Sequence, residues 1–170
     1  YPTSWIKQEG KRPNILQLIK SYDASCNMTI LIKDIIVEMG LDKSTLSKED
    51  RDYIYSGVFA DEMINDVFTY DYGSEYVDGM GLEGVGDYSY EKTKIDGQPA
   101  MLVKASGKLK RGTVDMRVFT INYLIIYENY MTNIGFMINS YDENLPEEKK
   151  KYELLCELIS SSLIFTEKWL

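Results

Sequence analysis

The stretch DYSYEKTKIDGQPAMLVKASGKLKRGTVDMRVFTINYLIIYENYMTNIGFMINSY (Asp87–Tyr141) contains four apolar, β-rich segments separated by turn residues. The pair Asp96-Gly97 is a strong hairpin turn sequence, because both residue types accept the positive φ values of a two-residue turn. Arg111-Gly112 and Glu128-Asn129 separate the next segments in the same way. Strands joined by such short turns pair antiparallel. The stretch therefore predicts an antiparallel sheet.

The third of these segments is the most buried of the predicted strands. From Phe119 onward it is apolar on both faces, which indicates a central strand that is covered on both sides. The first two segments alternate between apolar and polar residues, as a strand with one solvated face does. The four strands are expected at Tyr88–Ile95, Ala100–Lys110, Val114–Tyr127 and Tyr130–Tyr141.

One amphipathic helix is predicted directly after this sheet segment, over Pro146–Ser162. A proline and two glutamates in the first turn favour a helix start there. Four apolar residues then recur at helical spacing and should form the buried face of the helix. They are Tyr152, Leu155, Cys156 and Ile159.

The first half of the chain adds strands and a second helix. Trp5 should anchor a short strand, and Asn14–Tyr22 should form a hairpin with Cys26–Val37. Ser47 to Asp50 resembles a capping box, which predicts a helix over Ser47–Asp66. The prediction for residues 1–170 is thus a single α+β domain. It has a curved antiparallel sheet of about six to seven strands, with two main helices packed on it.

The segment Phe68–Asp87 is too polar and too rich in glycine for a core strand, although a short strand around Asp66–Tyr72 would fit. Its acidic residues could offer oxygen ligands to calcium, but their spacing does not match a known calcium loop. Tyrosines concentrate in and just after this segment and form the candidate interaction surface. These tyrosines are Tyr70, Tyr72, Tyr76, Tyr88 and Tyr90.

Charge and hydropathy exclude several classes of partner. The net charge is −8, which argues against nucleic acid and against anionic lipid surfaces. No apolar run approaches the roughly 20 residues of a membrane span. A local basic face indicates either a solvated or edge-guarding surface or a docking patch for an acidic partner. It consists of Lys104, Lys108, Lys110 and Arg111.

The sequence offers little catalytic chemistry. It contains no histidine, so a Ser–His–Asp or Cys–His arrangement within the chain is excluded. Cys26 and Cys156 lie in apolar patterns and are expected to be buried thiols; one long-range disulfide is the alternative. We predict no catalytic, cofactor-binding or metal-binding residues and no enzymatic activity. A hydrolase that relies on carboxylates alone is the alternative.

The order of elements resembles the PsbP-like fold, the superfamily that includes the Ran-binding Mog-type proteins. The resemblance rests on the opening Pro2–Trp5, on the stretch EKTKIDGQPA (Glu91–Ala100) before the strand meander, and on the ending Ser161–Phe165. It covers most of the chain. It implies a non-enzymatic binding or assembly protein, often exported and in several bacterial members a lipoprotein. It does not assign a function to any single residue.

These observations predict a non-catalytic binding or assembly domain of the cell envelope. Its partner would be a protein or a glycan that the sequence does not identify. Because the sequence opens at Tyr1 without a methionine, removal of a signal peptide or trimming of the chain is expected, with a lipid anchor upstream as one option. An envelope or secreted location is predicted, and a cytoplasmic one stays open.

Overall fold

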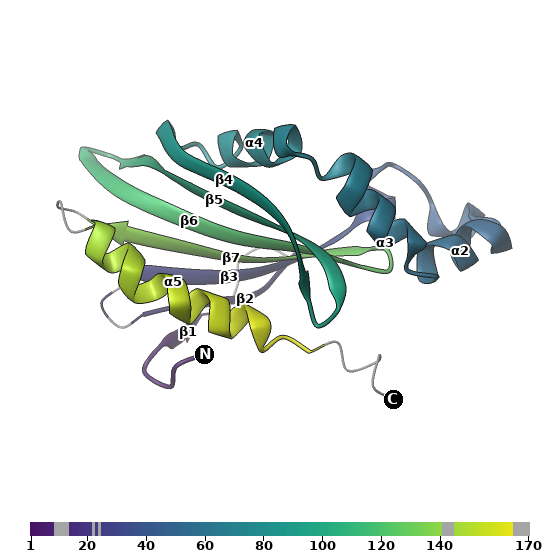
Figure 1. Cartoon of the computed structure of the whole chain (residues 1–170), viewed down its shortest axis with the longest axis horizontal. Helices are drawn as coiled ribbons and strands as arrows, with labels where there is room; N and C mark the ends of the chain where they lie inside the picture. The colour runs from purple at the N-terminus through teal and green to yellow at the C-terminus, as the bar shows by residue number, and fades with distance from the viewer. Residues whose placement is uncertain (9–13, 22, 24, 141–144, 165–170) are drawn as a thin grey trace.

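The computed structural model describes residues 1–8, 14–21, 23, 25–140 and 145–164. Within these residues the strands form one antiparallel seven-stranded sheet in the order β1-β2-β3-β7-β6-β5-β4. The sheet is strongly curved (Figure 1), so the predicted α+β class is confirmed. The strands are β1 (Ile6–Gln8), β2 (Ile15–Lys20), β3 (Cys26–Asp34), β4 (Glu83–Ile95), β5 (Gln98–Arg111), β6 (Val114–Tyr127) and β7 (Tyr130–Ser140).

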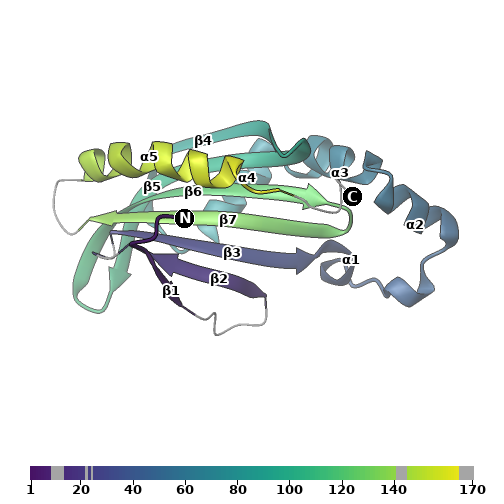
Figure 2. The same ribbon diagram turned by 90° about the horizontal axis from the view of Figure 1, so that it is seen from below.

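Helices cover both faces of the sheet (Figures 1 and 2). The last helix lies along one face, mainly over β6 and β7, and the helices between β3 and β4 lie on the other. In the described part of the chain no helix combines the length and hydropathy needed to cross a membrane. The helices are α1 (Ile35–Glu38), η1 (Lys43–Thr45), α2 (Lys48–Tyr55), α3 (Val58–Glu62), η2 (Met63–Val67), α4 (Tyr70–Asp78) and α5 (Leu145–Ser161).

Strand β6 is covered on both faces, as its apolar sequence predicted. Phe119 and Ile125 point into the apolar cluster under α5, whereas Val118 and Leu124 point into the cluster under α1–α4. All four are at most 1% exposed. Full burial of each such side chain contributes about 1.5–3 kcal/mol. Two separate cores on either side of one strand therefore hold the helices to the sheet.

The predicted hairpin turns at Asp96-Gly97 and Glu128-Asn129 are confirmed, and the third turn lies one residue later than predicted, at Gly112-Thr113. Asp96 and Gly97 both have positive φ values, of 49° and 74°, and Glu128 has a φ of 52°. Strand pairing starts directly beside these turns, with Ile95 opposite Gln98. The register of the meander is thus fixed locally at each turn.

The predicted helix over Ser47–Asp66 begins as expected but is interrupted. The Ser47 hydroxyl accepts a hydrogen bond from the Asp50 backbone N–H, and the Asp50 carboxylate accepts one from the Ser47 N–H, which completes the capping box. Helix α2 then ends at Tyr55, and Gly57 has a φ of 82°. This left-handed conformation cannot continue a right-handed helix, and the chain restarts as α3 and the π-helical η2.

The predicted strand Cys26–Val37 is too long at its end. Its last residue is Asp34, whose carboxylate accepts hydrogen bonds from the backbone N–H groups of Ile36 and Val37. An aspartate that caps in this way starts a helix, so Ile35–Glu38 forms α1.

The predicted short strand around Asp66–Tyr72 is wrong. Thr69 caps a helix there by accepting a hydrogen bond from the Tyr72 N–H, and α4 follows over Tyr70–Asp78. Strand β4 then starts at Glu83, five residues earlier than its alternating pattern indicated. Glycines and tyrosines hide the helical periodicity of α4, because few of its residues are plainly apolar.

The buried face of α5 is rotated from the predicted one. Tyr152 and Cys156 are buried as expected, and Ser160 continues their line at the same four-residue spacing. Leu155 and Ile159 are only half-buried at its side. The side chains of the first helical turn lie outside the described residues, so the proline and glutamates expected there are not placed.

Cys26 and Cys156 carry thiol groups, and both are fully buried in the cluster under α5. We therefore expect thiol reagents to modify neither in the native protein and both after unfolding in denaturant without reductant. Titration of thiols under the two conditions measures this. No reactive thiol in either condition would mean that the two residues are bridged.

The Asp23 carboxylate should make the stability of the folded chain depend on pH in the acid range. Hydrogen bonds, the largest from the Ser21 hydroxyl and others from Ser25, lower its pKa from 3.8 to about 2. Because the folded-state pKa is depressed, this stabilisation is present above about pH 4 and is lost as the pH falls towards 2. The side chain is 54% exposed. Allowing for solvent screening, we expect Asp23→Asn to cost about 1 kcal/mol at pH 7 and clearly less at pH 2, where the Asp23 carboxylate is half protonated in the folded chain, measured by urea denaturation.

Candidate functional site

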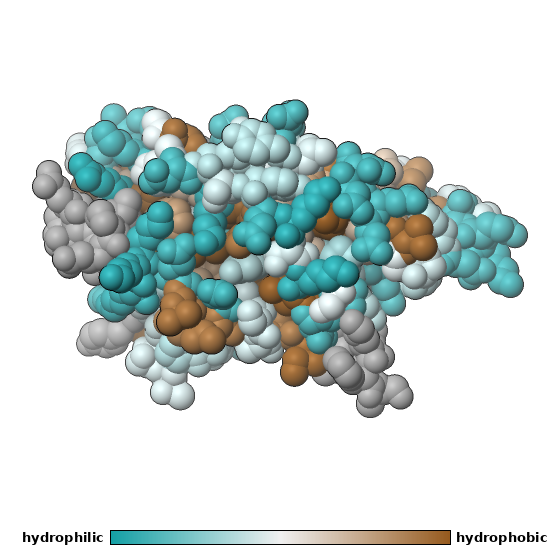
Figure 3. Space-filling model, viewed as in Figure 1, coloured by the Kyte–Doolittle hydropathy of each residue, from teal (hydrophilic) through white to brown (hydrophobic). Residues whose placement is uncertain are grey.

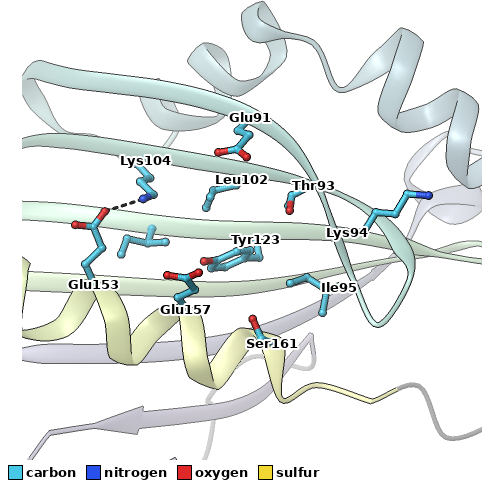
Figure 4. A pocket seen from close by; sticks show the side chains of 11 residues that line it. Glu91, Thr93, Lys94, Ile95, Leu102, Lys104, Tyr123, Glu153, Glu157 and Ser161 are labelled. Carbon is cyan, nitrogen blue, oxygen red and sulfur yellow. Dashed lines mark hydrogen bonds and ion pairs between the residues drawn. The ribbon is translucent and has the colours of Figure 1, made fainter.

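A groove opens on the α5 face of the sheet, between α5 and strands β4, β5 and β6 (Figure 4). Its volume is about 230 Å³. Polar side chains from all four elements line it, together with aliphatic groups of the sheet. The polar residues on which the site depends are Glu91, Thr93, Lys104, Tyr123, Glu153 and Glu157. We refer to this feature as the α5 groove.

The sheet register places the strand residues of the α5 groove in one row. Glu91 on β4 lies opposite Leu102 on β5, and Leu102 lies opposite Tyr123 on β6. Residues directly opposite each other project from the same face of a sheet. The row therefore runs from an acidic edge residue across an aliphatic one to an aromatic one.

Helix α5 supplies the other wall. Glu153, Glu157 and Ser161 follow each other at four-residue spacing and so lie on one side of the helix. Figure 4 shows the Glu153 and Glu157 side chains directed towards the sheet, facing the row of strand residues. The acidic side chains thus come from two elements that are far apart in the sequence.

The α5 groove carries more negative than positive charge. Lys104 donates a hydrogen bond to Glu153 Oε1 at 2.7 Å, which neutralises one of the three carboxylates. Glu91 and Glu157 form no ion pair with any other residue that the structure describes. Lys94 also lines the groove, but its amino group points away from the other side chains (Figure 4). Two carboxylates are therefore left without a counter-charge.

Tyr123 lines the α5 groove with a ring that is mostly buried and a hydroxyl that solvent can reach. Its side chain is 6% exposed, and its hydroxyl has no hydrogen-bond partner among the described residues. Burial, followed by the negative charge of nearby groups led by Glu157, raises its pKa to about 12. The phenol is thus protonated at neutral pH, with one donor and its acceptor lone pairs available inside the groove.

The carboxylates of the α5 groove do not form a desolvated acid–base pair. Glu91 and Glu157 are exposed, and Glu153 is half-buried in its ion pair with Lys104. Among residues placed by the structure, no group of three or more acidic or cysteine side chains is arranged to hold a metal ion. What the arrangement can do is accept hydrogen bonds from a positively charged donor.

The five predicted tyrosines gather on the opposite face of the sheet, around α4. Tyr70 lies edge-on against Tyr88 and Tyr90, at ring distances of 4.8 and 6.3 Å. The Tyr88 hydroxyl donates to the Tyr70 carbonyl oxygen at 2.8 Å, and the Tyr90 hydroxyl donates to the Phe68 carbonyl oxygen at 2.7 Å. These contacts attach the start of α4, and Phe68 two residues before it, to strand β4.

The remaining two tyrosines point further inward. Tyr76 accepts a hydrogen bond from Asn133 Nδ2 at 2.5 Å, and burial raises its pKa to about 12. Tyr72 stacks on Phe68 with the ring centres 4.5 Å apart. Only Tyr70, at 58% exposed, keeps most of its surface in solvent. The structure thus brings the predicted residues together, but four of the five are half-buried in the packing of α4.

The predicted basic face is divided between two environments. Lys104 enters the α5 groove, whereas Lys108 and Lys110 are exposed further along β5. The side chain of Arg111 lies outside the described residues. The acidic residues considered for calcium are spread over α4 and β4, with Asp71 and Asp87 both exposed.

Sequence reasoning missed most residues of the α5 groove. Tyr123 falls within the predicted central strand, and the sequence analysis singles out neither Glu153 nor Glu157. One pattern could have indicated the site: a tyrosine within an otherwise aliphatic stretch, whose hydroxyl needs a polar surrounding when buried. Its acidic neighbours come from other elements and become visible only in the folded structure.

No protein-family model and no curated protein matches the sequence. Among solved structures, the chain is similar to the crystal structure of a Pseudomonas aeruginosa protein of unknown function. The two are 12% identical, the alignment covers 94% of this chain and 80% of that chain, and the TM-score is 0.46. A similarity of this size carries no argument about function.

Proposed function

We propose that the chain is a non-catalytic binding domain that holds its ligand or partner in the α5 groove. The observation that carries this proposal is Tyr123, whose ring is packed into the sheet while its hydroxyl lines an open groove and has no hydrogen-bond partner among the described residues. Because the ring is fixed by packing, the hydroxyl presents a donor and an acceptor at one place, and a bound molecule would supply their partner. This is the feature expected of a site that is completed by its ligand.

The alternative of a hydrolase has weaker support. A carboxylate acts as a general acid near neutral pH when burial or a like charge raises its pKa. Glu91 and Glu157 are exposed, and Glu153 is paired with Lys104. We therefore favour binding over catalysis.

An assembly role in the cell envelope, and membership of the PsbP-like superfamily, remain part of the proposal. They rest on the sequence resemblance and on an α+β fold with one curved antiparallel sheet. The partner would be a protein or a glycan that reaches the α5 groove from solvent.

The test fills the groove and leaves the rest of the surface intact. Thr93→Trp and Ser161→Trp each place a bulky ring at a position that lines the α5 groove, and Glu49→Trp places one on exposed α2 as the matched control. The chain and its variants are immobilised and incubated with an envelope extract of the source cells, and bound molecules are identified by mass spectrometry. We expect capture by the natural chain and by Glu49→Trp, and loss of capture by both groove variants.

Thermal unfolding of each variant establishes that it is folded before capture is compared. Unchanged capture by both folded groove variants would place the binding surface elsewhere. Turnover of peptide or glycoside substrates by the natural chain, abolished by Glu157→Gln, would overturn the non-catalytic proposal.

A further inference from the structure

We propose that the α5 groove binds an organic cation, namely an ammonium or guanidinium group carried on an aliphatic stem. This inference rests on the proposed function and names the chemical class of the ligand. The carboxylates of Glu91 and Glu157 and the hydroxyl of Tyr123 provide the acceptors for the cationic head.

The charge of the groove selects the sign of the ligand. Three glutamates and two lysines line the groove, but Lys104 is paired with Glu153 and the Lys94 amino group points away from the other side chains (Figure 4). The two remaining carboxylates attract a cation and repel an anion. The pair formed by Lys104 and Glu153, with 2.7 Å between nitrogen and oxygen, is an internal example of the proposed contact. A cation bound beside it would make the equivalent contact with Glu157 or Glu91.

The unpartnered hydroxyl of Tyr123 favours a ligand with a directional donor. An N–H group of an ammonium or guanidinium can donate to the Tyr123 hydroxyl oxygen while its other N–H groups reach the carboxylates. A bare metal ion needs several oxygen ligands at one point, and the described residues contain no such cluster. An organic cation therefore fits the groove better than a metal ion.

The aliphatic side chains of the groove provide a surface for the stem of the ligand. Leu102, Ile121 and Ile95 line the same cavity as the carboxylates. Methylene groups would contact these side chains while the charged head stays at the acidic wall, as in the extended side chains of lysine and arginine. A free aliphatic diamine and an arginine side chain of a protein partner share this chemistry.

The experiment titrates the isotope-labelled chain by NMR with three probes at constant ionic strength. N-acetylarginine amide represents a peptide side chain, 1,4-diaminobutane represents a free amine, and N-acetylcitrulline amide is the neutral analogue of the first. We expect saturable shifts at the backbone amides of Glu91, Tyr123 and Glu157 with at least one of the two cations, and none with the citrulline compound. Tighter binding of the arginine compound indicates a peptide source, and tighter binding of the diamine a free amine.

Variants distinguish binding in the α5 groove from a general attraction of cations to the acidic surface. Tyr123→Phe keeps the ring but removes the acceptor, and Glu157→Gln keeps the shape but removes one charge; each should weaken binding about 3- to 10-fold. Glu75→Gln, an exposed acid on α4 on the opposite face, should leave it unchanged. Thermal unfolding confirms that each variant is folded.

Three outcomes would overturn the inference: equal shifts with the citrulline compound, non-saturating shifts spread over the acidic surface, or unchanged affinity in both folded groove variants. If any of these outcomes appears while Thr93→Trp and Ser161→Trp still abolish partner capture, the groove binds something other than a cation and the proposed function stands. If the groove-filling variants capture normally, the proposed function itself fails.

Discussion

Phe136→Ala should lower the free energy of unfolding by about 3–5 kcal/mol. Phe136 lies on β7, is 1% exposed, and projects into the cluster under α5. Its neighbours across the sheet on that face are Met28 on β3 and Ile121 on β6. Removal of the ring would leave a cavity between three strands and a helix. Because paired strands fix these neighbours, they cannot move inward to fill it.

Chemical denaturation of the purified chain measures this loss. Leu154→Ala on α5 is the matched control, because Leu154 is 63% exposed and its truncation should change stability by less than about 0.5 kcal/mol. An equal, small effect of the two substitutions would contradict the assignment of Phe136 to a packed core.

The sheet could be predicted because its determinants are local. The turn at Asp96-Gly97 fixes the register of β4 and β5 from Ile95 back to Ser89, and alternation along β5 identifies which side chains lie on each face. The continuous apolar run after Phe119 shows directly that both faces of β6 are covered. None of these inferences needs knowledge of a distant part of the chain.

The helices between β3 and β4 were harder to predict because single residues decide their ends. Asp34 turns a strand into a helix by capping, and the left-handed Gly57 interrupts a helix whose apolar pattern continues. Both residue types also occur in ordinary loops, so the sequence alone leaves these choices open.

The α5 groove could not be predicted because it is assembled from distant residues. Glu91, Tyr123 and Glu157 lie on three different elements, and only the register of β4–β6 and the rotation of α5 bring them to one cavity. The rotation of α5 was predicted only in part, because Leu155 appeared central to its buried face and Ser160 did not.

The clustered tyrosines are the opposite case, because the sequence located these residues correctly but did not reveal their role. Their abundance in one segment predicts a binding surface, and that prediction holds only where the aromatic side chains are exposed. In the folded chain Tyr88 and Tyr90 instead donate hydrogen bonds to backbone carbonyl groups at the start of α4. Composition indicated where aromatic groups gather, but their role depends on what packs against them.

Gly73→Leu should destabilise the protein by about 2–3 kcal/mol by forcing α4 away from the sheet. Gly73 lies in α4, and a β-carbon added there would be 2.5 Å from Tyr88 Oη and 3.3 Å from Val103 Cγ2. Tyr88 cannot move freely, since its hydroxyl is bonded to the Tyr70 carbonyl oxygen. Leucine has the better helix propensity by about 0.8–1 kcal/mol, which offsets only part of the clash.

The matched control is Glu75→Leu, which introduces the same side chain at an exposed position of α4 and should change stability by less than about 0.5 kcal/mol. Urea denaturation gives the stability of both variants, and amide hydrogen exchange in α4 and β4 shows where protection is lost. In Gly73→Leu we expect the loss to centre on the contact of α4 with β4, with the strands under α5 still protected. Equal stability of the two variants would mean that α4 does not approach the sheet as closely as Gly73 permits.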